Sequence, residues 1–145
     1  MKPVDETVTL SDLAATEGFA KRLSKEIAAG VSVGLSGTLG AGKTTFSRLL
    51  LNAWGYAKPV SSPTYVLHHE YTLESGIIVD HWDLYRLTEA PDELLTRCPA
   101  NHIRLVEWPE KAPEILDELD LRLHFTYAED GSPDSRLVEI SRLSS

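Results

Sequence analysis

The chain has 145 residues, which is long enough to bury a hydrophobic core and is typical of one domain. Hydrophobic residues make up 42% of it, yet no apolar run approaches the roughly 20 residues that span a bilayer, which argues against a membrane protein. The 14 basic and 22 acidic residues give a net charge of −8 with no Lys/Arg cluster, which argues against direct binding to nucleic acid.

The expected compartment is the cytoplasm. Cys98 is the only cysteine, so the chain cannot form an internal disulfide. The N-terminal segment MKPVDETVTL lacks the apolar stretch of a signal peptide. We therefore expect a single cytoplasmic domain over residues 1–145, without a membrane partner.

Strands alternate with helices in the first half of the chain. Strands are predicted at 6–11 and 31–36, and the second is a continuous run of small and apolar residues, as in a buried central strand. An amphipathic helix is predicted after each strand. The first ends near Gly30 and the second covers 43–54.

The second half is richer in strands. Strands are predicted at 64–73, 76–85, 102–108, 121–127 and 135–143, with helices from about Pro91 to Cys98 and, interrupted by proline, at 109–119. The last two strands flank turn residues and predict a C-terminal hairpin. This order favours an α/β fold, a three-layer sandwich with a mixed parallel/antiparallel sheet.

A glycine-rich segment, GTLGAGKTTF, joins the second strand to the second helix. Gly37, Gly42, Lys43 and Thr44 match the P-loop pattern G-x(4)-G-K-[ST], and the strand-to-helix context of that pattern is present. Glycines at such positions allow positive φ angles, so that backbone N–H groups can surround an anion next to a helix N-terminus. The segment therefore predicts a binding site for nucleotide phosphates.

The side chains of this segment have distinct expected roles. Lys43 reaches the β- and γ-phosphates, and the Thr44 hydroxyl is a ligand for Mg²⁺. Thr45 is expected near the α-phosphate. The pattern predicts nucleotide binding but does not define the reaction.

Phosphoryl transfer also needs a carboxylate for the metal and a group that positions the attacking atom. Asp80 follows the apolar run GIIV, Asp83 lies three residues further on, and Glu107 follows the largely apolar run IRLV. Asp80 and Asp83 are separated by an odd number of residues, so they face opposite sides of a regular strand. Spacing alone does not decide which of them faces the phosphates.

The adjacent residues His68 and His69 point to opposite faces of their predicted strand. The sequence places no cysteine or third histidine in an evident position to complete a zinc site with either of them. We therefore predict no zinc site here.

Four segments occur in series: GTLGAGKTTF from Gly37, SSPTYVL from Ser61, HWDLYRL from His81 and LVEWPE from Leu105. Together they resemble the TsaE (YjeE) family of small P-loop ATPases, which serves tRNA threonylcarbamoyladenosine modification. The resemblance extends over residues from about 7 to 127. It implies a P-loop NTPase fold.

The resemblance also implies roles for individual residues. Asp83, rather than Asp80, matches the metal-associated aspartate, and Glu107 matches an acidic residue that contacts the metal or activates water. Trp108 lies near the nucleotide. Thr16 matches a threonine near the adenine, and the switch-like loop is matched by Ser62, Pro63 and Thr64. The phosphate-binding positions are matched by Gly37, Leu39, Gly40, Ala41, Gly42, Lys43, Thr44 and Thr45.

The implied function is that of an ATP- and Mg²⁺-dependent ATPase that acts with the proteins TsaD and TsaB and meets tRNA only through them. Such an enzyme would reset the threonylcarbamoyl-transfer complex and would be weak alone. A nucleotide sensor without hydrolysis is a second reading. A small-molecule kinase is a third, although the chain has no arginine between Pro59 and Trp82 for a lid.

The chain departs from the family pattern in two places. Thr38 stands where the family usually has aspartate, which changes the local charge by one unit. The segment 90–103 is shorter than the family's connection. Phosphate binding is expected to tolerate both changes, whereas contacts of 90–103 with a partner are in question.

Overall fold

The computed structural model describes residues 4–38, 41–56, 58, 67–128 and 135–142. Seven strands form one sheet: β1 (Glu6–Leu10), β2 (Ser32–Gly37), β3 (His68–Thr72), β4 (Ile78–Asp83), β5 (His102–Glu107), β6 (Leu121–Tyr127) and β7 (Arg136–Arg142). The helices are α1 (Leu13–Glu26), α2 (Lys43–Ala53) and the 3₁₀ helices η1 (Asp92–Leu95), η2 (Pro109–Lys111) and η3 (Pro113–Glu118). Within the described ranges, no helix has the length and apolar character needed to cross a membrane.

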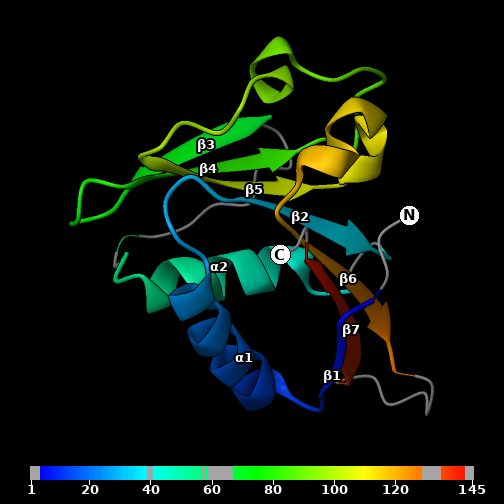
Figure 1. The fold of residues 1–145 in the computed structure, drawn as a ribbon. Helices are drawn as coiled ribbons and strands as arrows, with labels where there is room; N and C mark the ends of the chain where they lie inside the picture. Colours follow the sequence, from blue (N-terminus) through cyan, green and yellow to red (C-terminus); the bar gives the residue numbers. More distant parts are fainter. Residues whose placement is uncertain (1–3, 39–40, 57, 59–66, 129–134, 143–145) are drawn as a thin grey trace.

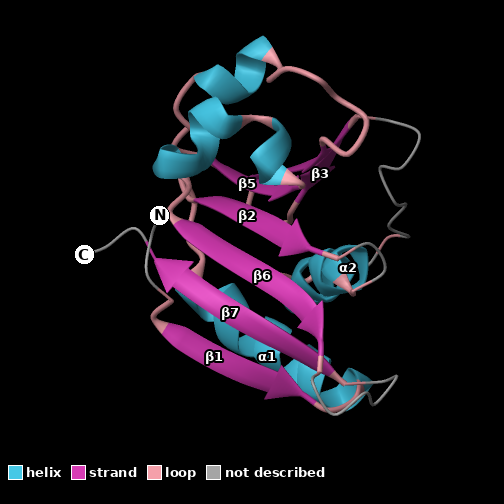
Figure 2. Cartoon of the chain, turned by 90° about the vertical axis from the view of Figure 1, so that its right-hand side faces the viewer, coloured by secondary structure: helices cyan, strands magenta, loops and turns pink. Residues whose placement is uncertain are grey.

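The sheet is mixed, as predicted. Its strand order is β1-β7-β6-β2-β5-β4-β3. The central strands β6, β2, β5 and β4 are parallel, whereas β7, β1 and β3 pair antiparallel at the two sides. The predicted C-terminal hairpin is confirmed by the pairing of β6 with β7 (Figure 2). Because β2, β5 and β4 run in the same direction, their carboxyl ends meet at one edge of the sheet.

Both α-helices lie on the same face of the sheet (Figure 1). Apolar residues of α1 and α2 meet those of the strands in one large core. Three aromatic rings pack in series within it. The ring centroids of Phe19 in α1 and Phe46 in α2 are 5.5 Å apart, and those of Phe46 and Phe125 in β6 are 5.4 Å apart. The helical layer is thus fixed on the sheet beside the β2–α2 connection.

The opposite face carries the 3₁₀ helices, which form the third layer (Figure 2). A second core cluster joins Trp82 of β4 and Val106 of β5 to Leu94, Ala112, Ile115 and Leu119. Gly34 of β2 explains how closely this layer approaches: a Cβ at Gly34 would lie 2.6 Å from Leu119 Cδ1. The α/β fold with three layers agrees with the sequence prediction.

Two predicted helices differ in type. The helix expected from Pro91 to Cys98 is a single 3₁₀ turn over Asp92–Leu95, and residues 109–119 form two 3₁₀ helices rather than one interrupted α-helix. Pro91, Pro99, Pro109 and Pro113 remove backbone donors and restrict the preceding residues, so neither segment has room for a continuous α-helix.

Candidate functional site

The glycine-rich segment begins where β2 ends, and two of its glycines have φ angles that other residues rarely adopt. Gly37 has φ +129°, and a Cβ on it would lie 2.0 Å from the carbonyl oxygen of Phe125 in β6. Gly42 has φ +106° and is the N-cap residue of α2. Because Gly42 offers no capping side chain, the first N–H groups of α2 remain available to an anion.

Lys43 is the first residue of α2 and is almost wholly buried, with 4% of it exposed. Its Nζ donates a hydrogen bond to the carbonyl oxygen of Gly37 (2.7 Å) and lies 3.6 Å from the centre of the Trp108 ring. Burial lowers the pKa of the Lys43 ammonium, and the nearby carboxylates of Glu107, Glu110 and Asp83 oppose that shift. The amino group of Lys43 is therefore held beside the helix N-terminus before any ligand binds, with carboxylates nearby that favour its charged form.

Glu107 ends β5 and joins three elements through one carboxylate. The Thr44 hydroxyl of α2 donates to it, at 3.1 Å from Oε1 and 3.3 Å from Oε2. The His81 Nε2 of β4 lies 2.5 Å from Oε2. Only 2% of Glu107 is exposed and His81 is fully buried. This carboxylate is thus fixed in position by groups on both sides.

Asp83 and Asp80 face opposite sides of β4, as their spacing predicted. Asp83 pairs in register with Glu107, and the charges of Glu107, His81 and Lys43 act on its carboxylate. Burial raises the pKa of Asp83, and the Glu107 carboxylate raises it further. Asp80 instead hydrogen-bonds His68 and His102. Asp83 therefore lies on the face of β4 that points toward Lys43, and its role as a metal ligand stays a prediction.

The remaining predicted site residues are placed as follows. Ala41 is buried, and its N–H donates to the carbonyl of Thr38 (3.0 Å). Thr45 follows Thr44 in α2 and is half-buried. The Thr16 hydroxyl donates to a carbonyl at the start of its own helix, that of Asp12 (3.1 Å). Predictions for Leu39, Gly40, Ser62, Pro63 and Thr64 lie outside the described residues.

The site's donor set fits Mg²⁺, which prefers oxygen ligands. The Thr44 hydroxyl already contacts the Glu107 carboxylate, and the half-buried Asp83 carboxylate lies at the end of the neighbouring strand. The hydrogen bond between His81 Nε2 and Glu107 Oε2 fixes the orientation of that carboxylate.

Sequence reasoning did not identify the partner of His81. The HWDLYRL segment predicts a hydrogen bond of His81 within that segment, and this prediction is wrong, because the partner of His81 is Glu107 in the LVEWPE segment. The alternation of side chains along the predicted strand indicates only that His81 and Asp83 share a face. The parallel pairing of β4 with β5, which brings His81 to Glu107, is seen in the structure.

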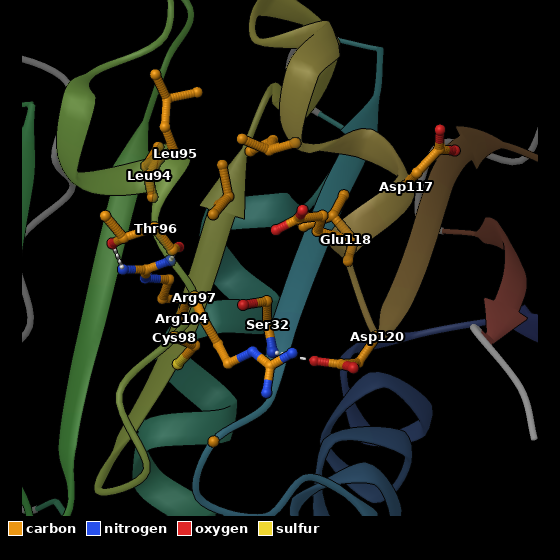
Figure 3. A pocket seen from close by; sticks show the side chains of 14 residues that line it. Ser32, Leu94, Leu95, Thr96, Arg97, Cys98, Arg104, Asp117, Glu118 and Asp120 are labelled. Carbon is orange, nitrogen blue, oxygen red and sulfur yellow. Dashed lines mark hydrogen bonds between the residues drawn. The ribbon is translucent and has the colours of Figure 1, made fainter.

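A separate pocket of about 650 Å³ lies around the start of β2 rather than at its end. Figure 3 shows Asp117, Glu118 and Asp120 on one side of it and residues 94–98 on the other. Asp120 accepts a hydrogen bond from the Ser32 N–H (2.9 Å) there. This pocket contains none of the residues predicted to bind nucleotide.

Comparisons with known proteins agree with the motifs. The family model described as threonylcarbamoyl adenosine biosynthesis protein TsaE matches residues 10–137. The TsaE protein of Haemophilus influenzae is 41% identical over 105 residues, which are 69% of this chain and 65% of that relative, just under two thirds of its length. The TsaE protein of Streptomyces coelicolor is 39% identical over 76% of this chain and 78% of its own length.

A solved structure shares the fold. The crystal structure of Bacillus subtilis YdiB superposes with a TM-score of 0.75 over 99% of this chain and 88% of that one, at 24% sequence identity. At this identity the likeness concerns the fold alone. On the family match over residues 10–137 and the two TsaE relatives, the chain belongs to the TsaE family.

Proposed function

We propose that the protein is a Mg²⁺-dependent ATPase of tRNA threonylcarbamoyladenosine biosynthesis. The observation that carries this proposal is the contact of Glu107 with Thr44 and His81 beside the buried Lys43. A phosphate-binding segment, oxygen donors and a fixed carboxylate are the components that phosphoryl transfer to water requires.

The residues divide the work according to their chemistry. The N–H groups at the start of α2 and the Lys43 ammonium bind the phosphates of ATP. The Thr44 hydroxyl and the Asp83 and Glu107 carboxylates would hold Mg²⁺, which would neutralise charge on the phosphate oxygens when bound. Glu107, held by His81, orients the attacking water, and transfer of the γ-phosphoryl group to that water yields ADP and phosphate.

The proposed partners are TsaD and TsaB. The TsaE relatives are named for threonylcarbamoyladenosine biosynthesis, and the net charge of −8 disfavours a direct approach to tRNA. We propose that docking on these proteins completes the catalytic geometry and that hydrolysis resets the complex. Turnover by the isolated chain is accordingly slow, and the compartment is the cytoplasm.

The first test is Glu107→Gln, which keeps the size and the acceptor oxygen of the side chain but removes its charge. We expect ATP affinity to stay within about threefold while turnover, measured with TsaD and TsaB present, falls at least about 100-fold. The matched control is Glu114→Gln on the exposed surface of η3, which should change neither quantity.

The alternative is a nucleotide sensor, in which ATP binding orders an interface without hydrolysis. For a sensor, wild type and Glu107→Gln would show the same absence of turnover and would bind the partners equally well in ATP. Isothermal titration with ATP, followed by phosphate release on the same samples, separates these outcomes.

A further inference from the structure

A second cluster of metal-binding side chains lies on the opposite face of the sheet from Lys43 and Glu107. His68 and Glu70 of β3 and Asp80 of β4 offer ligand atoms that all lie within 4.8 Å of one another. His102 of β5 reaches the same carboxylate from the other side. This face is separate from the proposed ATPase centre, because Asp80 and Asp83 point to opposite sides of β4.

The contacts of the Asp80 carboxylate divide its two oxygens between two histidines. His68 Nε2 lies 2.9 Å from Oδ1, and His102 Nδ1 lies 2.6 Å from Oδ2. Asp80 is only 5% exposed. Arg104, its register neighbour on β5, donates to the backbone carbonyls of Thr96 and Glu93 instead. Among the described residues, the ionisable groups that pair with Asp80 are therefore imidazoles, which are metal ligands.

The spacing of His68 Nε2 and Asp80 Oδ1 suits a metal ion in place of the hydrogen-bond proton between them. Two ligand atoms at about 2.1 Å from a zinc ion and 90–110° apart lie roughly 3.0–3.4 Å from one another. The 2.9 Å between His68 Nε2 and Asp80 Oδ1 is close to that spacing. The His68 ring is also held flat against the Trp82 ring, with centroids 4.0 Å apart and an interplanar angle of 5°. A metal would thus meet a ligand that is already oriented.

We propose that His68 Nε2, Asp80 Oδ1 and the Glu70 carboxylate bind a divalent transition metal ion, with Zn²⁺ as the test ion. One imidazole and two carboxylates suit first-row metals, and water completes the coordination because Glu70 is exposed and His68 is partly so. His102 holds the second oxygen of Asp80 and so orients that ligand. The ion would fix the edge strand β3 to β4.

This proposal revises the sequence prediction that no zinc site forms around His68. That prediction considered cysteines and further histidines near His68 along the chain. The structure brings in Asp80 and Glu70 through the antiparallel register of β3 and β4, in which Glu70 pairs with Asp80.

The test is isothermal titration of the full-length chain with Zn²⁺, without nucleotide. We expect one ion per chain in the wild type and a loss of affinity of at least about tenfold in His68→Gln and in Asp80→Asn. His102→Gln should weaken binding about 10- to 100-fold, as loss of an orienting partner does in other metal sites.

Two control variants locate the ion. His124→Gln removes an imidazole of β6 that bonds Ser36 of β2, and Glu107→Gln alters the proposed ATPase centre. Both should bind Zn²⁺ as the wild type does. Absence of Zn²⁺ binding in the wild type, unchanged binding in His68→Gln, or loss of binding in Glu107→Gln would overturn the proposal.

A measurement on the wild type alone covers the case in which a variant fails to fold. In a long-range ¹H–¹⁵N spectrum of the histidine rings, Zn²⁺ should shift the Nε2 resonance of His68 and leave the nitrogens of His124 unchanged. A titration that leaves His68 Nε2 unshifted would also overturn the proposal.

Discussion

Lys43 meets two conflicting requirements. Its amino group is buried in the ligand-free protein, and it must also be able to bind a phosphate when the nucleotide arrives. Lys43 is 4% exposed and has a backbone carbonyl and an aromatic ring as close neighbours. Burying a charged group costs free energy that these contacts offset only in part. A cost of this kind is common at functional sites, where stability is lost to place a reactive group.

Lys43→Met tests this trade-off, because methionine keeps much of the apolar stem of the side chain and removes the charged group that lies over the Trp108 ring. We expect the ligand-free protein to melt at the same or a higher temperature, while ATP affinity falls at least about tenfold through the lost charge-assisted bonds. Lys25→Met, on the exposed last turn of α1, is the control and should change neither. Destabilisation of the ligand-free protein by Lys43→Met, or unchanged ATP affinity, would contradict this account.

Asp83→Asn tests the raised pKa of Asp83. As pH rises, the carboxyl ionises in the unfolded chain before it does so in the folded protein, so folding loses stability through that range. The asparagine variant lacks this loss and still accepts the hydrogen bond from the Tyr85 N–H.

The variant should therefore gain stability relative to the wild type as pH rises from about 4 through the raised pKa, and the difference should then level off. Urea unfolding across this range measures it. A constant difference between the two proteins at every pH would show that Asp83 titrates at its ordinary value.

At this scale, the sequence predicted the identity of the central residues better than their contacts. Lys43 and Thr44 follow from a local pattern with a local physical reason. The contact between Glu107 and His81 depends on the pairing of β4 with β5, which no local pattern specifies.

Among the elements, the β2–α2 connection has the strictest requirement on sequence. Gly37 combines a positive φ with a closely packed carbonyl oxygen of β6, whereas Gly55 has a positive φ (+88°) in open space. Gly18 lies in α1 with nothing within 4 Å of an added Cβ. These three glycines separate the effect of backbone strain from that of steric overlap.

Alanine at each position should give a graded series. Gly18→Ala should stabilise the protein by about 0.5–1 kcal/mol through helix propensity. Gly55→Ala should cost about 1–2 kcal/mol through strain alone. Gly37→Ala should cost more than about 3 kcal/mol because β2 and β6 must also separate. Urea unfolding measures all three, and equal costs at Gly37 and Gly55 would contradict the role assigned to Phe125.

The prediction of elements succeeded where hydrophobic periodicity was long and failed where proline was frequent. The seven strands and both α-helices follow from their apolar patterns. The sequence pattern predicts helices over 91–98 and 109–119, yet these segments form 3₁₀ turns, because each is short and includes or adjoins prolines.

For the molecule as a whole, the mixed sheet keeps two sets of polar side chains apart. Glu107, His81 and Asp83 lie toward α2, whereas His68, Asp80 and His102 lie on the other face. The sequence predicted the layered architecture and the family, because both depend on patterns along the chain. The second cluster depends on three strands coming together and was not predicted.

The proposed function requires that this site hydrolyses ATP and that partner proteins complete it. The most direct measurement is phosphate release from ATP by the purified chain, alone and with TsaD and TsaB, with Lys43→Ala as the control. We expect slow phosphate release by the chain alone, strong stimulation by the pair and no release by Lys43→Ala. Tight ATP binding without release in either condition would contradict the proposed function.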